Sequence, residues 1–186
     1  MVDVIARSSA QAQGLRGPIT SLQKLQRAGQ TLYLAAERTV ADRVRLVGLL
    51  KTGRKSLFLR DAGAAYCSRQ LLCVLDFFVL PQHQRQGLGQ ALFQVFQATE
   101  QESPGSVAYD TPSPKLLSFL QKHYGLGDFM PQDNRFVVFN AFWQSHSSSN
   151  AEQREECCIK GTDAATQQIR IGTPCSAPSN SCTLAI

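Results

Sequence analysis

A short glycine-containing segment offers the clearest chemistry in this sequence. It reads Gln-Arg-Gln-Gly-Leu-Gly over 84–89, between an apolar run and an amphipathic helical pattern. Such an arrangement binds phosphate groups, because the first N–H groups of a helix lack partners and the helix dipole is positive there. Gly87 and Gly89 would let backbone N–H groups approach a diphosphate, and Arg85 would add a charge-assisted bond. The spacing fits neither the dinucleotide-binding glycine pattern nor the P-loop, and an ordinary strand-to-helix turn remains an alternative.

Composition narrows the classes of function. The 186 residues carry a net charge of +5 and are 43% apolar, which predicts one folded domain with an affinity for an anionic ligand or an acidic protein surface. The basic residues are dispersed, so we expect no nucleic acid partner. No run approaches the roughly 20 apolar residues of a membrane span. The six cysteines show no CxxC pair and histidine is scarce, so we expect no metal and an intracellular, reducing compartment.

The elements that would position this turn follow from periodicity. A helix over 1–13 is expected first, then a short helix capped by Thr20 or Ser21 and ended by Gly29. A strand is expected over 31–36. The segments 43–50 and 56–60 predict a β-hairpin around a turn at 51–55, with an irregular connection over 61–70.

The apolar run 71–80 predicts a strand buried on both faces. Alternation places Cys73 and Phe77 on one face and Asp76 on the other, where a buried carboxylate needs a partner. A helix over 87–100, a short strand over 106–109, a helix from Pro114 to Gly125 and a last strand over 135–143 follow. This order predicts a mixed α/β sheet built around a central strand–turn–helix unit.

From residue 144 the composition turns polar and loses its apolar period. The expected organisation is therefore a domain over 1–143 and a disordered, low-complexity tail over 144–186. The tail has a net charge of −1, so the basic character belongs to the domain.

Four colinear blocks resemble the α-tubulin N-acetyltransferases, a family of GNAT acetyltransferases. They are AQGLRGPITS (12–21), LCVLDFFVLPQHQRQGLGQALF (72–93), YDTPSPKLLSFLQKHYGL (109–126) and PQDNRFVVFNAFW (131–143). The turn itself fits the GNAT diphosphate-binding pattern Q/R-x-x-G-x-G/A. The chain departs from the family at Gln86 and Leu88, where His is frequent, and at Gln90, where Arg is frequent. The family also has about another strand and the start of a helix before the point where this chain begins.

The resemblance implies a GNAT-like fold with a mixed, mostly antiparallel central sheet flanked by helices. It implies transfer of an acetyl group from acetyl-CoA to one α-tubulin lysine on the lumenal side of microtubules. A monomer in the cytoplasm, on the cytoskeleton and on the microtubules of a cilium or flagellum would follow, with no membrane partner. Asp110 and Cys73 are implied as catalytic, and Gln13 as important for activity. The implied acetyl-CoA contacts are Phe77, Phe78, Val79, Leu80, Pro81, Gln82, His83, Gln84, Arg85, Gln86, Gly87, Leu88, Gly89, Gln90, Ser113, Pro114, Lys115, Leu116, Leu117, Ser118, Phe119, Leu120, Gln121 and Lys122.

Each implied role has a plainer alternative. Asp110 could cap a turn before Thr111 and Pro112, and Cys73 could be a small core residue. Lys115 and Lys122 could simply line the solvated face of a helix. Asp110 and Cys73 would assist deprotonation of the amine for direct transfer, while a covalent acetyl-cysteine is the other route. A GNAT enzyme for another protein or small-molecule amine, or a catalytically weak microtubule-associated module, remains an alternative function.

Overall fold

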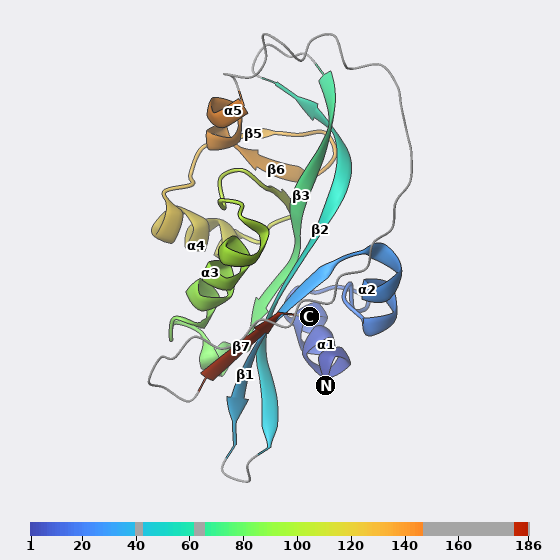
Figure 1. Cartoon of the computed structure of the whole chain (residues 1–186), viewed down its shortest axis with the longest axis vertical. Coiled ribbons are helices and arrows are strands. Elements are labelled where there is room, and N and C mark those ends of the chain that lie inside the picture. Colours follow the sequence, from blue (N-terminus) through green and yellow to red (C-terminus); the bar gives the residue numbers. More distant parts are fainter. Residues whose placement is uncertain (40–42, 62–65, 147–180, 186) are drawn as a thin grey trace. The chain divides into compact units, whose positions relative to one another are not determined.

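The computed structural model describes residues 1–39, 43–61, 66–146 and 181–185 (Figure 1). The chain forms two compact units. Of the described residues, the first unit contains 1–39, 43–53, 74–102 and 181–185, and the second contains 54–61, 66–73 and 103–146. Two long strands, β2 (Val44–Arg60) and β3 (Tyr66–Val79), contribute a segment to each unit.

The first unit opens with two helices that the sequence predicts correctly. Helix α1 spans Val2–Ala12 and buries its apolar stripe. Helix α2 spans Leu22–Ala28, where the Ser21 side chain accepts a hydrogen bond from the Lys24 N–H at 3.3 Å. It ends at Gly29, whose left-handed conformation (φ 57°) a residue without Cβ adopts without strain.

Strand β1 (Thr31–Arg38) lies between β2 and β7 (Ser181–Ala185) and is antiparallel to both. Its register with β2 runs from Thr31–Thr52 to Arg38–Val44, with an irregularity between Ala35 and Ala36. Hydrogen-bonded neighbours in the first unit therefore follow the order β3-β2-β1-β7.

The two faces of β1 pack against different helices, because successive side chains of a strand point to opposite faces of the sheet. Leu32 and Leu34 join a core cluster with Val2 and Ile5 of α1. Tyr33 points to the opposite face, where its ring packs edge-on against Phe96 at 6.2 Å. Phe96 belongs to helix α3 (Leu88–Glu100), so α1 and α3 cover opposite faces of these strands (Figure 1).

The second unit is built around β4 (Ala108–Asp110), β5 (Phe129–Pro131) and β6 (Phe136–Phe139). Strand β6 pairs antiparallel with both others, and neighbours follow the order β5-β6-β4-β3-β2. Helix α4 spans Pro114–Tyr124 and α5 spans Asn140–His146. Tyr109 and Phe139, both buried, pack edge-on at 5.5 Å in the core of this unit.

The predicted mixed, mostly antiparallel α/β sheet is confirmed, but the predicted hairpin around residues 51–55 is wrong. Strand β2 runs without interruption through it, because Lys51 and Thr52 are buried and have partners far away in the sequence. The Lys51 ammonium donates to the Ile19 carbonyl at 2.8 Å, and the Thr52 hydroxyl donates to Glu100 at 3.3 Å. At Gly53 a Cβ would lie 2.9 Å from the Gln30 side chain, so this glycine permits close packing instead of a turn.

Other boundaries also differ from the prediction. Strand β3 begins at Tyr66, inside the expected irregular connection over 61–70. The expected final strand over 135–143 ends at Phe139, because α5 begins at Asn140. In the expected disordered tail over 144–186, residues 144–146 complete α5 and 181–185 form β7, while 147–180 and 186 lie outside the described residues.

Gly48 provides a test of packing in the first unit. A Cβ there would lie 3.2 Å from Leu92 Cδ1 and 3.3 Å from Ala35 Cβ. We expect Gly48→Ala to lower the free energy of unfolding by about 1–3 kcal/mol, the usual cost of overpacking, as measured by chemical denaturation.

Gly17→Ala is the matched control, since a Cβ there meets nothing within 4 Å and the backbone is not left-handed. We expect it to change the free energy of unfolding by less than about 0.5 kcal/mol, or to stabilise slightly. Equal losses in the two variants would contradict the packing argument.

Candidate active site

Asp110 lies at the end of β4 with its side chain exposed to solvent. The next residue, Thr111, has a left-handed backbone (φ 45°), and its hydroxyl donates to Asp110 Oδ1 at 3.0 Å. The Thr111 N–H donates to the Arg135 carbonyl at 3.2 Å, which ties this corner to the residue before β6. The carboxylate is thus held at an accessible strand end, as a general base requires.

Cys73 lies in the same unit on β3, fully buried. Burial raises the pKa of the Cys73 thiol to about 12; the negative charge of Asp110 also raises it, while Lys55 opposes the shift through its charge and its backbone N–H. The thiol donates to the Leu71 carbonyl at 3.4 Å. Cys73 therefore carries its proton at neutral pH, and the negative charge of Asp110 contributes to this.

The predicted phosphate-binding turn lies in the first unit. After β3, the Leu80 N–H donates to the Val47 carbonyl at 2.9 Å and a single 3-10 turn follows over Pro81–His83. The Gln84 side chain donates back to the Val79 carbonyl at 2.9 Å. Gly87 then caps α3 without any side-chain hydrogen bond, and the Ala91 N–H donates to the Gly87 carbonyl at 2.9 Å. The N–H groups of residues 88–90 consequently have no side-chain cap, which suits an anion.

Two left-handed residues shape this turn. Arg85 has φ 61° and Gly87 has φ 82°. A left-handed non-glycine residue costs free energy and is enriched at functional sites, while glycine adopts this conformation freely. Backbone N–H groups in turns that alternate handedness form concave anion sites. The turn before α3 has this alternation of handedness at Arg85 and Gly87.

Helix α4, the second expected acetyl-CoA segment, lies in the second unit. Ser113 accepts a hydrogen bond from the Leu116 N–H at 3.2 Å, so its hydroxyl serves as the helix cap. Leu116 and Leu120 are buried, whereas Lys115 and Lys122 are exposed. The two lysines and the helix start therefore offer groups to an anion.

Gln13 lies in the first unit, at the end of α1. Its backbone occupies the sparsely populated bridge region, with φ −95° and ψ 0°. The Leu15 N–H donates to the Ala10 carbonyl and the Gly14 N–H to the Gln11 carbonyl, at 2.9 and 3.2 Å. With Gly14 at φ 66°, this is a Schellman motif that fixes where Gln13 leaves the helix.

The side chain of Gln13 binds the buried carboxylate of Asp76. Gln13 Nε2 donates to Asp76 Oδ1 at 3.2 Å and to Ser9 Oγ at 2.7 Å. Ser9 donates to the same Oδ1 at 3.0 Å, and Thr20 donates to Oδ2 at 2.6 Å. The need of Asp76 for partners is confirmed, but periodicity could not name Ser9 and Thr20, which lie 67 and 56 residues away along the chain.

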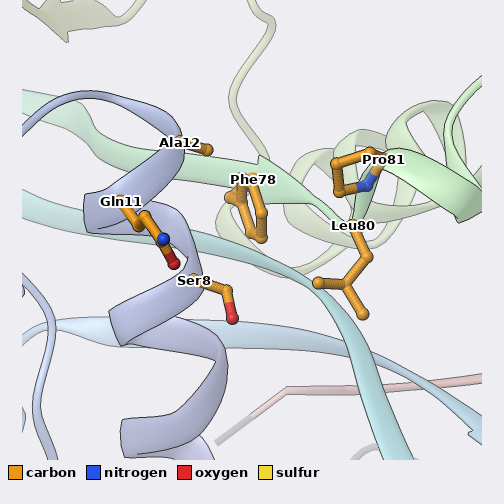
Figure 2. A pocket seen from close by; sticks show the side chains of 6 residues that line it. All are labelled: Ser8, Gln11, Ala12, Phe78, Leu80 and Pro81. Carbon is orange, nitrogen blue, oxygen red and sulfur yellow. The ribbon is translucent and has the colours of Figure 1, made fainter.

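An open hollow of about 290 Å³ lies in the first unit, beside the start of the turn that leads from β3 to α3. Figure 2 shows that three side chains come from α1 and three from the end of β3 and the residues after it. The lining residues are Ser8, Gln11, Ala12, Phe78, Leu80 and Pro81. The three α1 residues were not predicted; the signal that could have found them is their helical spacing of three and four next to Gln13.

The described residues contain no helix long and apolar enough to cross a membrane. They also contain no group of three or more His, Cys, Asp or Glu side chains suited to hold a metal ion. Cys67 and Cys73 are free thiols.

Comparison with known proteins identifies the family. Residues 1–170 match the family model described as GNAT acetyltransferase, Mec-17. The chain is 45% identical over 149 residues to an α-tubulin N-acetyltransferase 1 of Danio rerio, covering 80% of this chain and 50% of that protein. It is 42% identical over 155 residues to α-tubulin N-acetyltransferases of Tetrahymena thermophila and Aedes aegypti, covering 83% of this chain and 38% and 57% of theirs.

The chain thus spans between 38% and 57% of the length of these relatives. A solved structure of the AtaT mutant toxin bound to the antitoxin AtaR and acetyl-CoA aligns at a TM-score of 0.46 and 12% identity, covering 70% of this chain and 79% of that one. The match over residues 1–170 and the identity of 42–45% to these relatives show that the chain belongs to the Mec-17 family of GNAT acetyltransferases.

Proposed function

We propose that this chain is an acetyl-CoA-dependent N-acetyltransferase that modifies a lysine side chain of α-tubulin on the lumenal side of microtubules. The observation that carries the proposal is the identity of 42–45% to proteins named for this activity. The open N–H groups at the start of α3 and the exposed carboxylate of Asp110 support it. Such an enzyme would act on the cytoskeleton, including the microtubules of a cilium.

Acetyl-CoA would bind as the co-substrate, with its diphosphate at the turn before α3. The backbone N–H groups of residues 88–90 would donate to the phosphate oxygens, and the Arg85 guanidinium would add a charge-assisted bond. The exposed Lys115 and Lys122 of α4 are further candidates for phosphate contacts.

Asp110 would act as the general base. A lysine amine has an ordinary pKa of roughly 10.4, so it must lose a proton before it attacks a thioester. The Asp110 carboxylate would accept that proton, the amine nitrogen would bond to the acetyl carbon, and the carbon–sulfur bond would break. The CoA thiolate would leave and take up the second proton that the nitrogen loses as the amide forms, and Asp110 would return its own proton to solvent.

Direct transfer is favoured over a covalent acetyl-cysteine. Thiolates are the nucleophiles in acyl transfer, and a buried thiol with a pKa of about 12 is almost never ionised at neutral pH. Cys73 would therefore shape the site as a neutral hydrogen-bond donor and not as a nucleophile.

A second candidate is acetyl transfer to another amine, because an exposed base and a diphosphate turn do not by themselves select tubulin. A panel of free tubulin, polymerised tubulin, peptides and polyamines, each with labelled acetyl-CoA, separates the two. Faster transfer to a different amine would favour the second candidate, and CoA binding without transfer to anything would favour a non-catalytic microtubule-associated module.

The role of the turn is tested by Gly87→Ala. A side chain at φ 82° is strained by about 1–2 kcal/mol, and relief of that strain would turn the N–H groups away from the diphosphate. We expect CoA to bind several-fold to about tenfold more weakly, as measured by calorimetry. Gly17→Ala should bind CoA like the wild type, and unchanged affinity in Gly87→Ala would argue against this location.

The role of the base is tested by Asp110→Asn. We expect acetylation of polymerised tubulin to fall by about a hundredfold or more, the usual contribution of a general base, while CoA still raises the melting temperature. Asp128→Asn is the matched control, since Asp128 is exposed in the same unit and holds no proposed role. Retained activity in Asp110→Asn would remove Asp110 from the mechanism.

The state of Cys73 is tested through the pH dependence of stability. Its pKa is higher in the folded chain (about 12) than in the unfolded chain (about 9), so burial of the thiol stabilises the fold below pH 9 and this contribution is lost as the pH rises from 9 to 12. We expect wild-type stability to fall by about 1.4 kcal/mol more per pH unit above 9 than that of Cys73→Ala.

Denaturation of both proteins between pH 8 and 11 measures this difference. If the free energy of unfolding fell equally with pH in both proteins, Cys73 would ionise in the folded chain as readily as in the unfolded one. Incubation with acetyl-CoA alone, followed by mass spectrometry, should show no acetyl group on Cys73, and its presence would reinstate the covalent route.

A further inference from the structure

The amide group of Gln13 is held in one orientation. An ionised carboxylate only accepts hydrogen bonds, so Asp76 Oδ1 requires the donor end of the Gln13 amide to face it. Ser9 strengthens this requirement, because its single hydroxyl proton goes to Asp76 and leaves the Ser9 oxygen to accept from Gln13 at 2.7 Å. Both contacts therefore select the –NH₂ end of the amide.

The opposite end of the amide faces outward as a consequence. Gln13 is exposed, and its Oε1 accepts no hydrogen bond from any residue that the structure describes. Gln13 is also held at the backbone by the Schellman motif that ends α1. A fixed, unpaired carbonyl oxygen at the surface is suited to accept a hydrogen bond from a donor on a ligand.

We propose that Asp76 is a positioning residue that fixes the polarity of the Gln13 amide, so that Gln13 Oε1 accepts a hydrogen bond from an N–H donor of the amine substrate. This inference rests on the proposed function for its substrate. It differs from a packing role for Asp76 because it requires the charge of the carboxylate, which an isosteric asparagine lacks. With asparagine at 76 either end of the Gln13 amide could face inward.

The orientation is tested without any activity measurement. In the free, ¹⁵N-labelled chain, the Gln13 side-chain –NH₂ resonances are identified as the pair missing from Gln13→Met. We expect their hydrogen exchange to be about tenfold or more slower than that of Gln23, which is exposed, and to approach the Gln23 rate in Asp76→Asn. Exchange at the Gln23 rate in the wild type would overturn the proposed orientation.

The functional link is tested by a double-mutant cycle on kcat/KM for acetyl transfer. We expect Asp76→Asn and Gln13→Met each to lower it about tenfold to a hundredfold, the range for losing one hydrogen bond to a charged group. If Asp76 acts through Gln13, adding Asp76→Asn to Gln13→Met lowers kcat/KM by less than about threefold. An equal loss in both backgrounds would show that Asp76 has only a structural role, and would overturn the proposal.

Two controls complete the design. Asp3→Asn changes an exposed carboxylate on α1, the helix that ends at Gln13, and should leave kcat/KM unchanged. If Asp76→Asn does not fold, Ser9→Ala removes one of the two contacts that select the –NH₂ end and should show the same dependence on Gln13. A wild-type chain that transfers no acetyl group would contradict the proposed function, while the exchange experiment would still decide the orientation of Gln13.

Discussion

The arrangement of the first twenty residues depends on the buried carboxylate of Asp76, which needs hydrogen-bond donors. A desolvated carboxylate is costly unless its oxygens are hydrogen-bonded, and three side chains meet that need here. Ser9 lies in α1, Gln13 at its end, and Thr20 just before α2. Because all three must reach one carboxylate, the end of α1, the turn that follows and the approach to α2 are fixed together against β3.

A second constraint fixes the start of α3. The helix is anchored by Leu92, Phe93 and Phe96, all fully buried, and Phe93 packs edge-on against Phe77 of β3 at 5.2 Å. Strand, turn and helix therefore form one packed unit, and the N–H groups at the helix start keep their direction without a side-chain cap. The core residues hold the groups that would bind an anion, so packing and binding depend on the same elements.

Structural features that depend on residues close together in the sequence could be predicted. Features that depend on contacts between residues far apart in the sequence could not. Helices α1 to α4 carry clear apolar periods, α2 and α4 end at Gly29 and Gly125, and the Gly87 turn is local as well. The run Lys51-Thr52-Gly53 resembles a turn, yet Ile19 and Glu100 satisfy its polar groups inside β2. For the same reason the sequence showed that Asp76 needs partners, but not that Gln13 is one of them.

Strain marks both places where chemistry is expected. Arg85 and Thr111 have left-handed backbones (φ 61° and 45°), and Thr111 is β-branched, which makes that conformation especially costly. Such residues persist only where their surroundings hold them, and Thr111 is held by its bonds to Arg135 and Asp110. Relaxation of Thr111 would release the contact that orients the Asp110 carboxylate. The strain at this corner therefore holds the Asp110 carboxylate in place, and this is the pre-organisation that the proposed role of Asp110 as a base would need.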